Sequence, residues 1–228
     1  MEIKVLRNVL EANDALAAEN RRLFGQHGVV VLNLMSSPGA GKTTLLERTL
    51  DALKVQFSLG VIEGDIATAY DAQRIGRHEV PVVQINTGGA CHLDANMIRL
   101  ALKEFSVQGM DLLFIENVGN LVCPAEFALG EDMKVTVLSV PEGDDKPEKY
   151  PAMFQQSSAL VLNKIDLLPL TDFDMAAATR RALALNPRLV IFPVSCRTGE
   201  GLEGWLDWLR DLVRDRRMTA ADAQSPKP

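Results

Sequence analysis

Two kinds of hydrophobic pattern alternate along this chain. Short runs of apolar and β-branched residues predict buried strands, and segments whose apolar residues recur every three or four positions predict amphipathic helices. The predicted strands span residues 29–34, 57–62, 80–85, 112–115, 135–140, 159–162 and 189–194. About seven strands alternating with helices indicate an α/β fold, in which a mostly parallel sheet is flanked by helices on both faces.

Helical patterns also occupy the two ends of the chain. Residues 1–27 are predicted to form an N-terminal amphipathic helix, because leucines recur at near-helical spacing until Gly25 and Gly28 end the pattern. Residues 202–217 carry a second apolar stripe. From residue 218 the chain is small, polar and proline-containing, which predicts a disordered tail over 218–228. Residues 28–217 are therefore expected to form one large domain.

Composition narrows the classes of function. A net charge of −6 and a pI near 5.2 disfavour a nucleic-acid binder that neutralises phosphates. No run approaches the ~20 apolar residues of a membrane span. The charged N-terminal segment lacks the apolar centre of a signal peptide, so a cytoplasmic protein is expected. Three cysteines, an odd number, favour free thiols or metal binding over a disulfide framework.

The segment 36–43 reads SSPGAGKT and lies between the first strand of this domain and a helical pattern. Phosphate-binding loops occupy this place in α/β folds, where backbone N–H groups and a helix N-terminus face the phosphates. Ser36 stands where the G-x-x-x-x-G-K-[ST] pattern has glycine, which weakens the formal match. The residues assigned to phosphate binding are Gly39, Ala40, Gly41, Lys42, Thr43 and Thr44.

A second motif, Asn163-Lys164-Ile165-Asp166, follows a predicted strand and resembles the N-K-x-D element of GTPases. A carboxylate at Asp166 accepts from both the ring N–H and the exocyclic amine of guanine, a donor pair that adenine lacks. Ser195 and Cys196 follow the last strand, where a second base-contacting loop is expected, although a plain strand-to-helix turn explains them too.

Two carboxylates at strand ends are suited to Mg²⁺ and water chemistry. Phosphoryl transfer needs Mg²⁺ on the phosphate oxygens and a group that orients the attacking water. We therefore assign Lys42, Asp65 and Glu116 to catalysis, and Thr43, Asp65 and Glu116 to Mg²⁺, leaving the division of roles between the two acids open. For Glu63, a solvated carboxylate at a strand end is as good an explanation as a functional role.

Cys91, His92 and Cys123 form a third candidate cluster. Thiolate and imidazole ligands suit Zn²⁺ or Ni²⁺, but three ligands leave a four-coordinate site one short. Adjacent residues also tend to point to different sides, so a site shared between two copies of the chain is more natural than a single-chain site. The alternative is a buried thiol beside a surface histidine.

Taken together, these motifs resemble the HypB family, the GTPases of nickel insertion into [NiFe]-hydrogenase, in the SIMIBI class of P-loop proteins. The stretches that carry the resemblance are 36–44, 63–65, 84–88, 91–95, 115–124, 142–147 and 163–166. The resemblance implies a GTPase domain over 28–217 that binds GTP and GDP and forms a homodimer on GTP binding. It implies Ni²⁺ or Zn²⁺ at Cys91, His92 and Cys123 near the dimer contact. It also implies a HypA-type nickel chaperone as partner and a hydrogenase large-subunit precursor as indirect recipient.

Two departures from the family pattern are visible. Residues 1–35 contain no cysteine and one histidine, so a separate high-affinity nickel motif is not expected there. Gly89 stands where many members have lysine, which removes a cation near the metal. Two other functions stay open: an accessory GTPase for urease or a cobalamin enzyme, and a metal carrier in which nucleotide is only structural.

Overall fold

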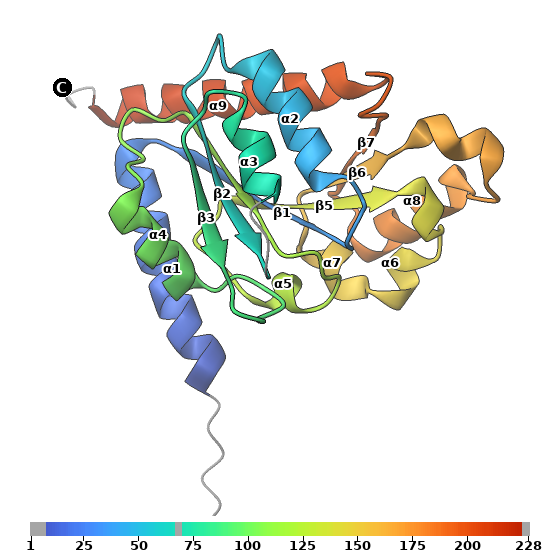
Figure 1. The fold of residues 1–228 in the computed structure, drawn as a ribbon, viewed down its shortest axis with the longest axis horizontal. Coiled ribbons are helices and arrows are strands. Elements are labelled where there is room, and N and C mark those ends of the chain that lie inside the picture. The colour runs from blue at the N-terminus through green and yellow to red at the C-terminus, as the bar shows by residue number, and fades with distance from the viewer. Residues whose placement is uncertain (1–7, 67–69, 225–228) are drawn as a thin grey trace, which may run out of the picture.

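The computed structural model describes residues 8–66 and 70–224 and contains one seven-stranded sheet (Figure 1). Every strand pair in this sheet is parallel, in the order β3-β2-β4-β1-β5-β6-β7. The strands are β1 (Val30–Ser36), β2 (Leu59–Asp65), β3 (Val82–Asn86), β4 (Leu112–Glu116), β5 (Met133–Ser139), β6 (Ala159–Asn163) and β7 (Val190–Pro193). The predicted α/β fold is confirmed, and the sheet is parallel throughout.

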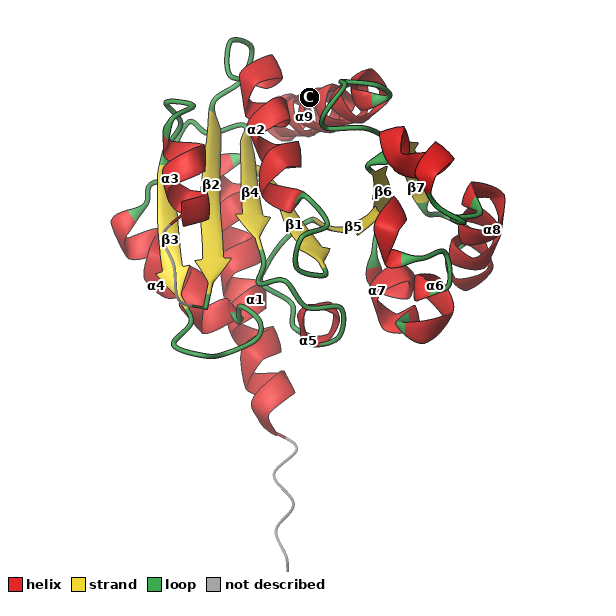
Figure 2. Ribbon diagram, turned by 45° about the vertical axis from the view of Figure 1, so that its right-hand side comes forward, coloured by secondary structure: helices red, strands yellow, loops and turns green. Residues whose placement is uncertain are grey.

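Helices pack on both faces of the sheet (Figure 2). One face is covered by α2, α3 and α9, and the other by α1 and α4 over the β3 side and by α7 and α8 over the β7 side. The helices are α1 (Asn8–His27), α2 (Lys42–Leu53), α3 (Tyr70–Gly76), α4 (Ala95–Glu104), α5 (Cys123–Glu126), α6 (Lys146–Lys149), α7 (Pro151–Gln156), α8 (Met175–Leu185) and α9 (Leu202–Gln224). Two 3₁₀ helices, η1 (Val140–Glu142) and η2 (Ile165–Leu170), follow β5 and β6.

The central strand β1 explains why the core has two sides. All of its residues are buried. Val30, Leu32 and Leu34 pack against α2 and α9, whereas Val31 packs in the cluster that holds α1 and α4. Since successive side chains of a strand point to opposite faces, a continuous apolar run can serve two helical layers. The parallel strands then all end at one edge of the sheet, where open α/β folds bind ligands.

The C-terminal end of the chain differs from the prediction, whereas α1 ends at His27, as predicted. The last helix continues to Gln224, although the sequence predicts its end near residue 217 and a disordered tail beyond. Alanine has the highest helix propensity, and the alanine-containing segment 219–224 has no proline to stop the helix. Residues 1–7 of the predicted first helix and 225–228 of the predicted tail lie outside the described residues. Across residues 8–66 and 70–224, no helix is both long and apolar enough to cross a membrane.

Candidate functional site

The loop between β1 and α2 has the backbone of a phosphate cradle. Gly39 and Gly41 have positive φ angles of 77° and 101°, a region that side-chain-bearing residues rarely adopt. A Cβ on Gly41 would also lie 2.4 Å from the Nδ2 atom of Asn163. Glycine at position 41 is thus required both by the turn and by the approach of the N-K-x-D segment.

Lys42 lies at the base of this loop and is buried. Its Nζ donates to the Ser36 Oγ at 2.9 Å, and burial lowers the pKa of the Lys42 ammonium against the opposing pull of Glu116. Ser36, which departs from the glycine of the loop pattern, therefore supplies a neutral acceptor to the lysine. An ammonium that is buried and held by one neutral hydroxyl is poised to exchange that partner for phosphate oxygens.

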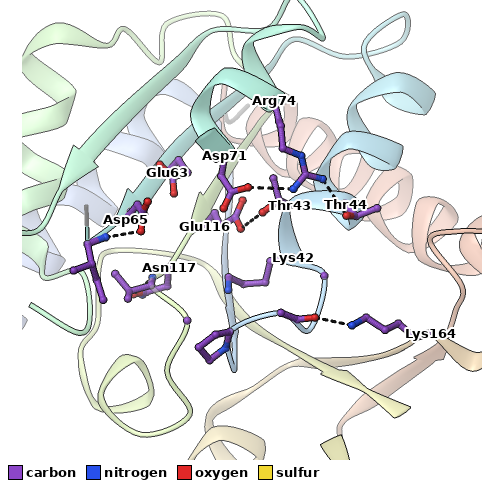
Figure 3. A pocket seen from close by; sticks show the side chains of 17 residues that line it. Lys42, Thr43, Thr44, Glu63, Asp65, Asp71, Arg74, Glu116, Asn117 and Lys164 are labelled. Atoms are coloured by element: carbon purple, nitrogen blue, oxygen red, sulfur yellow. Dashed lines mark hydrogen bonds and ion pairs between the residues drawn. The ribbon is translucent and has the colours of Figure 1, made fainter. Parts of the chain in front are cut away.

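Acidic side chains form the opposite wall of the pocket (Figure 3). Glu63 and Glu116 lie side by side on β2 and β4, and both are buried. Within residues 8–66 and 70–224, each has one carboxylate oxygen without a hydrogen-bond partner. Burial raises the pKa of Glu63 to about 8 and that of Glu116 to about 7. The Glu116 Oε1 accepts from the Thr43 hydroxyl at 2.8 Å.

This wall fits a divalent cation. Hard cations such as Mg²⁺ prefer oxygen ligands, and orphaned buried carboxylate oxygens are costly until a cation or proton satisfies them. The residues suited to hold Mg²⁺ are Thr43, Glu116 and, at the end of β2, Asp65, whose Oδ1 accepts from the Ile66 N–H. Glu63, for which a solvated position was an equal alternative, is buried beside Glu116 instead.

The structure adds an ion-pair cluster that the motifs did not reveal. Asp71 and Arg74 of α3 line the same pocket, which has a volume of about 510 Å³. The Arg74 guanidinium donates to Asp71 at 3.1 Å, to the Thr44 Oγ1 at 3.1 Å and to Glu47 at 2.6 Å. The i, i+3 spacing of Asp71 and Arg74 on a helical pattern was the only local signal for this pair.

A second hollow of about 390 Å³ adjoins the first and shares Gly41, Thr44 and Lys164 with it. Asp166 lines this hollow, and its Oδ1 accepts from the Ser195 hydroxyl at 2.6 Å. A carboxylate oriented by a neighbouring hydroxyl at a strand end is suited to the paired N–H donors of guanine.

Asn163 forms hydrogen bonds to both the phosphate loop and the loop beside the second hollow. Its Nδ2 donates to the Ala40 carbonyl at 2.9 Å, and its Oδ1 accepts from the Cys196 N–H at 3.2 Å. Lys164, with a left-handed φ of 63°, donates through Nζ to the Gly39 carbonyl at 2.7 Å. The structure therefore brings the predicted phosphate loop, the N-K-x-D segment and the residue 195–196 loop into one continuous site.

The cysteine cluster lies on the same edge of the sheet, in the loops after β3 and β4. The potential ligand atoms of Cys91, His92 and Cys123 all lie within 4.8 Å of one another, and the two Sγ atoms are 3.2 Å apart. Burial lowers the pKa of His92, whose ring packs 4.0 Å from that of Phe127. The hydrogen bond between the two thiols raises the pKa of Cys123. A single chain thus gathers all three ligands, although adjacent Cys91 and His92 were expected to diverge.

The third cysteine is chemically separate from this cluster. Cys196 is buried beside the base hollow, and burial raises the pKa of its thiol to about 11. Its Sγ atom is not among the gathered potential ligand atoms, which belong to Cys91, His92 and Cys123. Its backbone, which donates to Asn163, is the part that contributes to the site.

Comparisons with family models and with known proteins identify the same family. Residues 30–193 match the model of the CobW/HypB/UreG nucleotide-binding domain. The chain is 54% identical over 207 residues to the hydrogenase maturation factor HypB of Rhizobium leguminosarum bv. viciae, covering 91% of this chain and 69% of that protein.

Solved structures agree with this match. The HypB crystal structure from Archaeoglobus fulgidus aligns with a TM-score of 0.84 at 40% identity, covering 89% of this chain and 99% of that chain. The structure of HypB from Helicobacter pylori in complex with nickel aligns with a TM-score of 0.84 at 42% identity, covering 90% of this chain and 96% of that one.

Proposed function

The chain belongs to the HypB group of the CobW/HypB/UreG family, and we propose that it is a GTP-hydrolysing metallochaperone that delivers nickel during [NiFe]-hydrogenase maturation. In this proposal, nucleotide-dependent homodimerisation is coupled to binding of Ni²⁺ or Zn²⁺ at the cysteine cluster. The metal is cargo that the protein passes on, and GTP hydrolysis is the chemical step that the protein performs.

The nucleotide roles follow from the geometry of the pocket. Lys42 and the N–H groups of residues 39–44 would bind the β- and γ-phosphates, while Asp166 would select guanine. Thr43, Glu116 and Asp65 would hold Mg²⁺, which when bound neutralises charge that develops on the phosphate oxygens. The Glu116 carboxylate accepts a hydrogen bond from the Thr43 hydroxyl. This bond joins the end of β4 to the phosphate loop before nucleotide binds.

One observation carries the proposed coupling. The short segment 116–123 supplies Glu116 to the nucleotide site at one end and Cys123 to the cluster at the other. Between them, Gly119 packs so closely on the phosphate loop that a Cβ there would lie 3.0 Å from the Pro38 Cα. A ligand that shifts either end of this segment must act on the other end, and the effect is reciprocal.

Partner proteins are inferred from the family. We infer a HypA-type nickel chaperone as a direct partner and the hydrogenase large-subunit precursor as the final recipient. The three gathered ligands leave a position that a second copy, a partner or a solvent molecule could fill. This supports a site that is completed in the dimer and opened when the metal is handed over.

The first test measures phosphate release from GTP and ATP with Mg²⁺, together with chain mass in GDP and in a non-hydrolysable GTP analogue. The proposal predicts hydrolysis of GTP in preference to ATP and a doubled mass with the analogue. No GTP turnover would remove the enzymatic part, and a constant mass would remove the dimer switch.

A second test separates the clients. Deleting the gene should abolish hydrogenase activity, and added nickel should restore part of it, because the protein supplies metal rather than cofactor chemistry. Loss of urease activity with normal hydrogenase would instead favour the accessory GTPase of another nickel enzyme.

A further inference from the structure

A buried chain of polar side chains runs behind the two sites and begins at Asn117. This residue directly follows Glu116 and is labelled among the pocket-lining side chains in Figure 3. Its side chain is buried, with 1% of its surface exposed. Its Oδ1 accepts from the Leu93 N–H and from the Val118 N–H, each at 3.0 Å. Leu93 comes directly after the metal-ligand pair Cys91 and His92. Asn117 therefore holds the backbone of one metal-ligand segment.

The chain continues across the central strand. The Asn117 Nδ2 donates to the Asn33 Oδ1 at 3.2 Å, and the Asn33 Nδ2 donates to the Glu131 Oε1 at 3.2 Å. The other carboxylate oxygen of Glu131 accepts from the Leu129 N–H at 2.6 Å. Asn33 and Glu131 are buried, so each of these polar groups depends on the next for its partner.

The far end of the chain reaches the second metal-ligand segment. Lys134 Nζ lies 3.8 Å from the Glu131 Oε1 and donates to the carbonyls of Pro124 and Ala125. Those two residues belong to α5, the short helix that Cys123 begins. Both loops of the cysteine cluster are thus connected through Asn117, Asn33, Glu131 and Lys134.

The direction of every bond in the chain is determined by chemistry. The Asn117 Oδ1 must face two backbone N–H donors, so its Nδ2 must face Asn33. Glu131 as a carboxylate only accepts, so the Asn33 Nδ2 must face it. Neither side-chain amide can flip by about 180° without leaving a buried polar group without a hydrogen bond, which costs about 1–3 kcal/mol.

We propose that Asn117, Asn33 and Glu131 are positioning residues that hold the Cys91-His92 loop and the Cys123 helix in register with the Glu116 strand end. The inference rests on the proposed function and adds to it the residues that transmit nucleotide state to metal affinity. Asn117 joins the two sites because Glu116, its neighbour, bonds to Thr43 of the phosphate loop while its own side chain bonds to the metal loop.

The proposal predicts that the hydrogen bonds joining positions 117, 33 and 131 can all run in either direction. Metal binding should weaken only when some of these bonds are reversed and the others are not. In Asn117→Asp with the new carboxyl group ionised, position 117 keeps its acceptor for Leu93 but loses its donor, so two acceptors meet along the row of hydrogen bonds. In Glu131→Gln two amide donors meet instead. In the double variant every bond between positions 117, 33 and 131 runs in the opposite direction, and each buried group regains a partner.

The experiment titrates Ni²⁺ into the full chain in GDP and in a non-hydrolysable GTP analogue with Mg²⁺, for wild type, both single variants and the double variant. Each single variant should bind Ni²⁺ about tenfold more weakly, as is typical when outer-shell partners of a metal site are lost. The ratio of the two Kd values should also move toward 1. The double variant should recover most of the affinity and of the ratio.

Two controls distinguish positioning from general damage. Asn186→Asp makes the same chemical change at a half-buried asparagine that bonds to Phe154 and Ser157, and it should leave both Ni²⁺ Kd values unchanged. Glu131→Gln should leave GDP affinity without Ni²⁺ unchanged, because Glu131 does not line the nucleotide pocket. If Asn117→Asp does not fold, Glu131→Gln and the double variant carry the same comparison.

Folded single variants with wild-type Ni²⁺ affinity would overturn the proposal, and so would a folded double variant no better than the singles. A wild-type protein with equal Kd values in both nucleotide states would overturn the coupled function instead. The positioning role would then be decided by the loss and recovery of Ni²⁺ affinity alone.

Discussion

The nucleotide pocket and the cysteine cluster lie on one edge of the sheet but are built differently. Lys42, Thr43, Glu116 and Asn163 are buried, and each sits at a strand end or the start of a long helix. The candidate metal ligands Cys91, His92 and Cys123 are half-buried, and two of them lie in the loop between β3 and α4. The nucleotide site is therefore held by its own motifs, whereas the metal site is held by side chains some distance away.

The N-terminal helix shows the same contrast. Asn20 of α1 donates to the carbonyls of Ala95 and Leu129, both at 2.9 Å. These carbonyls lie just beyond the two metal-ligand segments. Substitutions behind the two candidate metal-ligand segments should consequently weaken metal binding even where they replace no candidate ligand.

The largest effect is expected from Lys42→Ala. Removing the buried ammonium should weaken triphosphate binding by about 1,000-fold, because the phosphates lose a charge-assisted partner in a buried site. Fluorescent-nucleotide titration measures this, with Lys103→Ala on the exposed face of α4 as the matched control. If Lys42→Ala still hydrolysed GTP, the assignment of segment 36–43 to phosphate binding would be contradicted.

The next effect concerns the base. Asp166→Asn should lower the preference for GTP over ATP by about 100-fold, since two charge-assisted bonds to guanine are lost. Competition titrations with both nucleotides measure the preference, and circular dichroism checks the fold. Unchanged discrimination would contradict the assignment of Asp166 to guanine.

A smaller effect is expected at the cluster. Cys123→Ser should weaken Ni²⁺ binding by about 30-fold, comparable to losses at other metal-site positions. GTP hydrolysis without metal should remain near the wild-type rate, because Cys123 does not line the nucleotide pocket. Cys196→Ser is the matched control, and equal metal stoichiometry and affinity in all three proteins would exclude Cys123 from the site.

The smallest effect is a pH dependence of stability. Burial raises the pKa of Glu63 from 4.5 to about 8, so the folded state binds a proton that the unfolded state releases between these values. Without Mg²⁺ and nucleotide, the wild type should therefore lose stability as pH rises from about 5 to about 8. Glu63→Gln removes this ionisation, so its free energy of unfolding should rise relative to that of the wild type between pH 5 and pH 8. Urea unfolding at pH 5 and pH 8 measures the gain, and a difference that does not change with pH would contradict the buried position of Glu63.

The fold could be predicted because its signals are local. Each strand is rich in apolar and β-branched residues, and the loop at 36–43 lies directly between a strand and a helix. The family resemblance covered the same motifs, and the comparisons with known proteins confirm the family.

The supports of the metal loops could not be predicted in this way. Asn33 and Glu131 are 98 residues apart in the chain, and a single asparagine inside an apolar strand gives no sign of its partner. The burial of Glu63 depends on the pairing of β2 with β4, which no local pattern specifies. The helical extension of α9 to Gln224 was missed because small polar residues were taken as a sign of disorder, although alanine favours helix.

We propose that nucleotide state and metal affinity are linked in this protein. The most direct test measures Ni²⁺ affinity in GDP and in the GTP analogue, and analogue affinity with and without Ni²⁺, on the wild-type protein. We expect Ni²⁺ to change the preference for the analogue over GDP by the same factor by which the analogue changes Ni²⁺ affinity relative to GDP. Ni²⁺ affinities that are identical in the two nucleotide states would contradict it, leaving a GTPase beside an independent metal site.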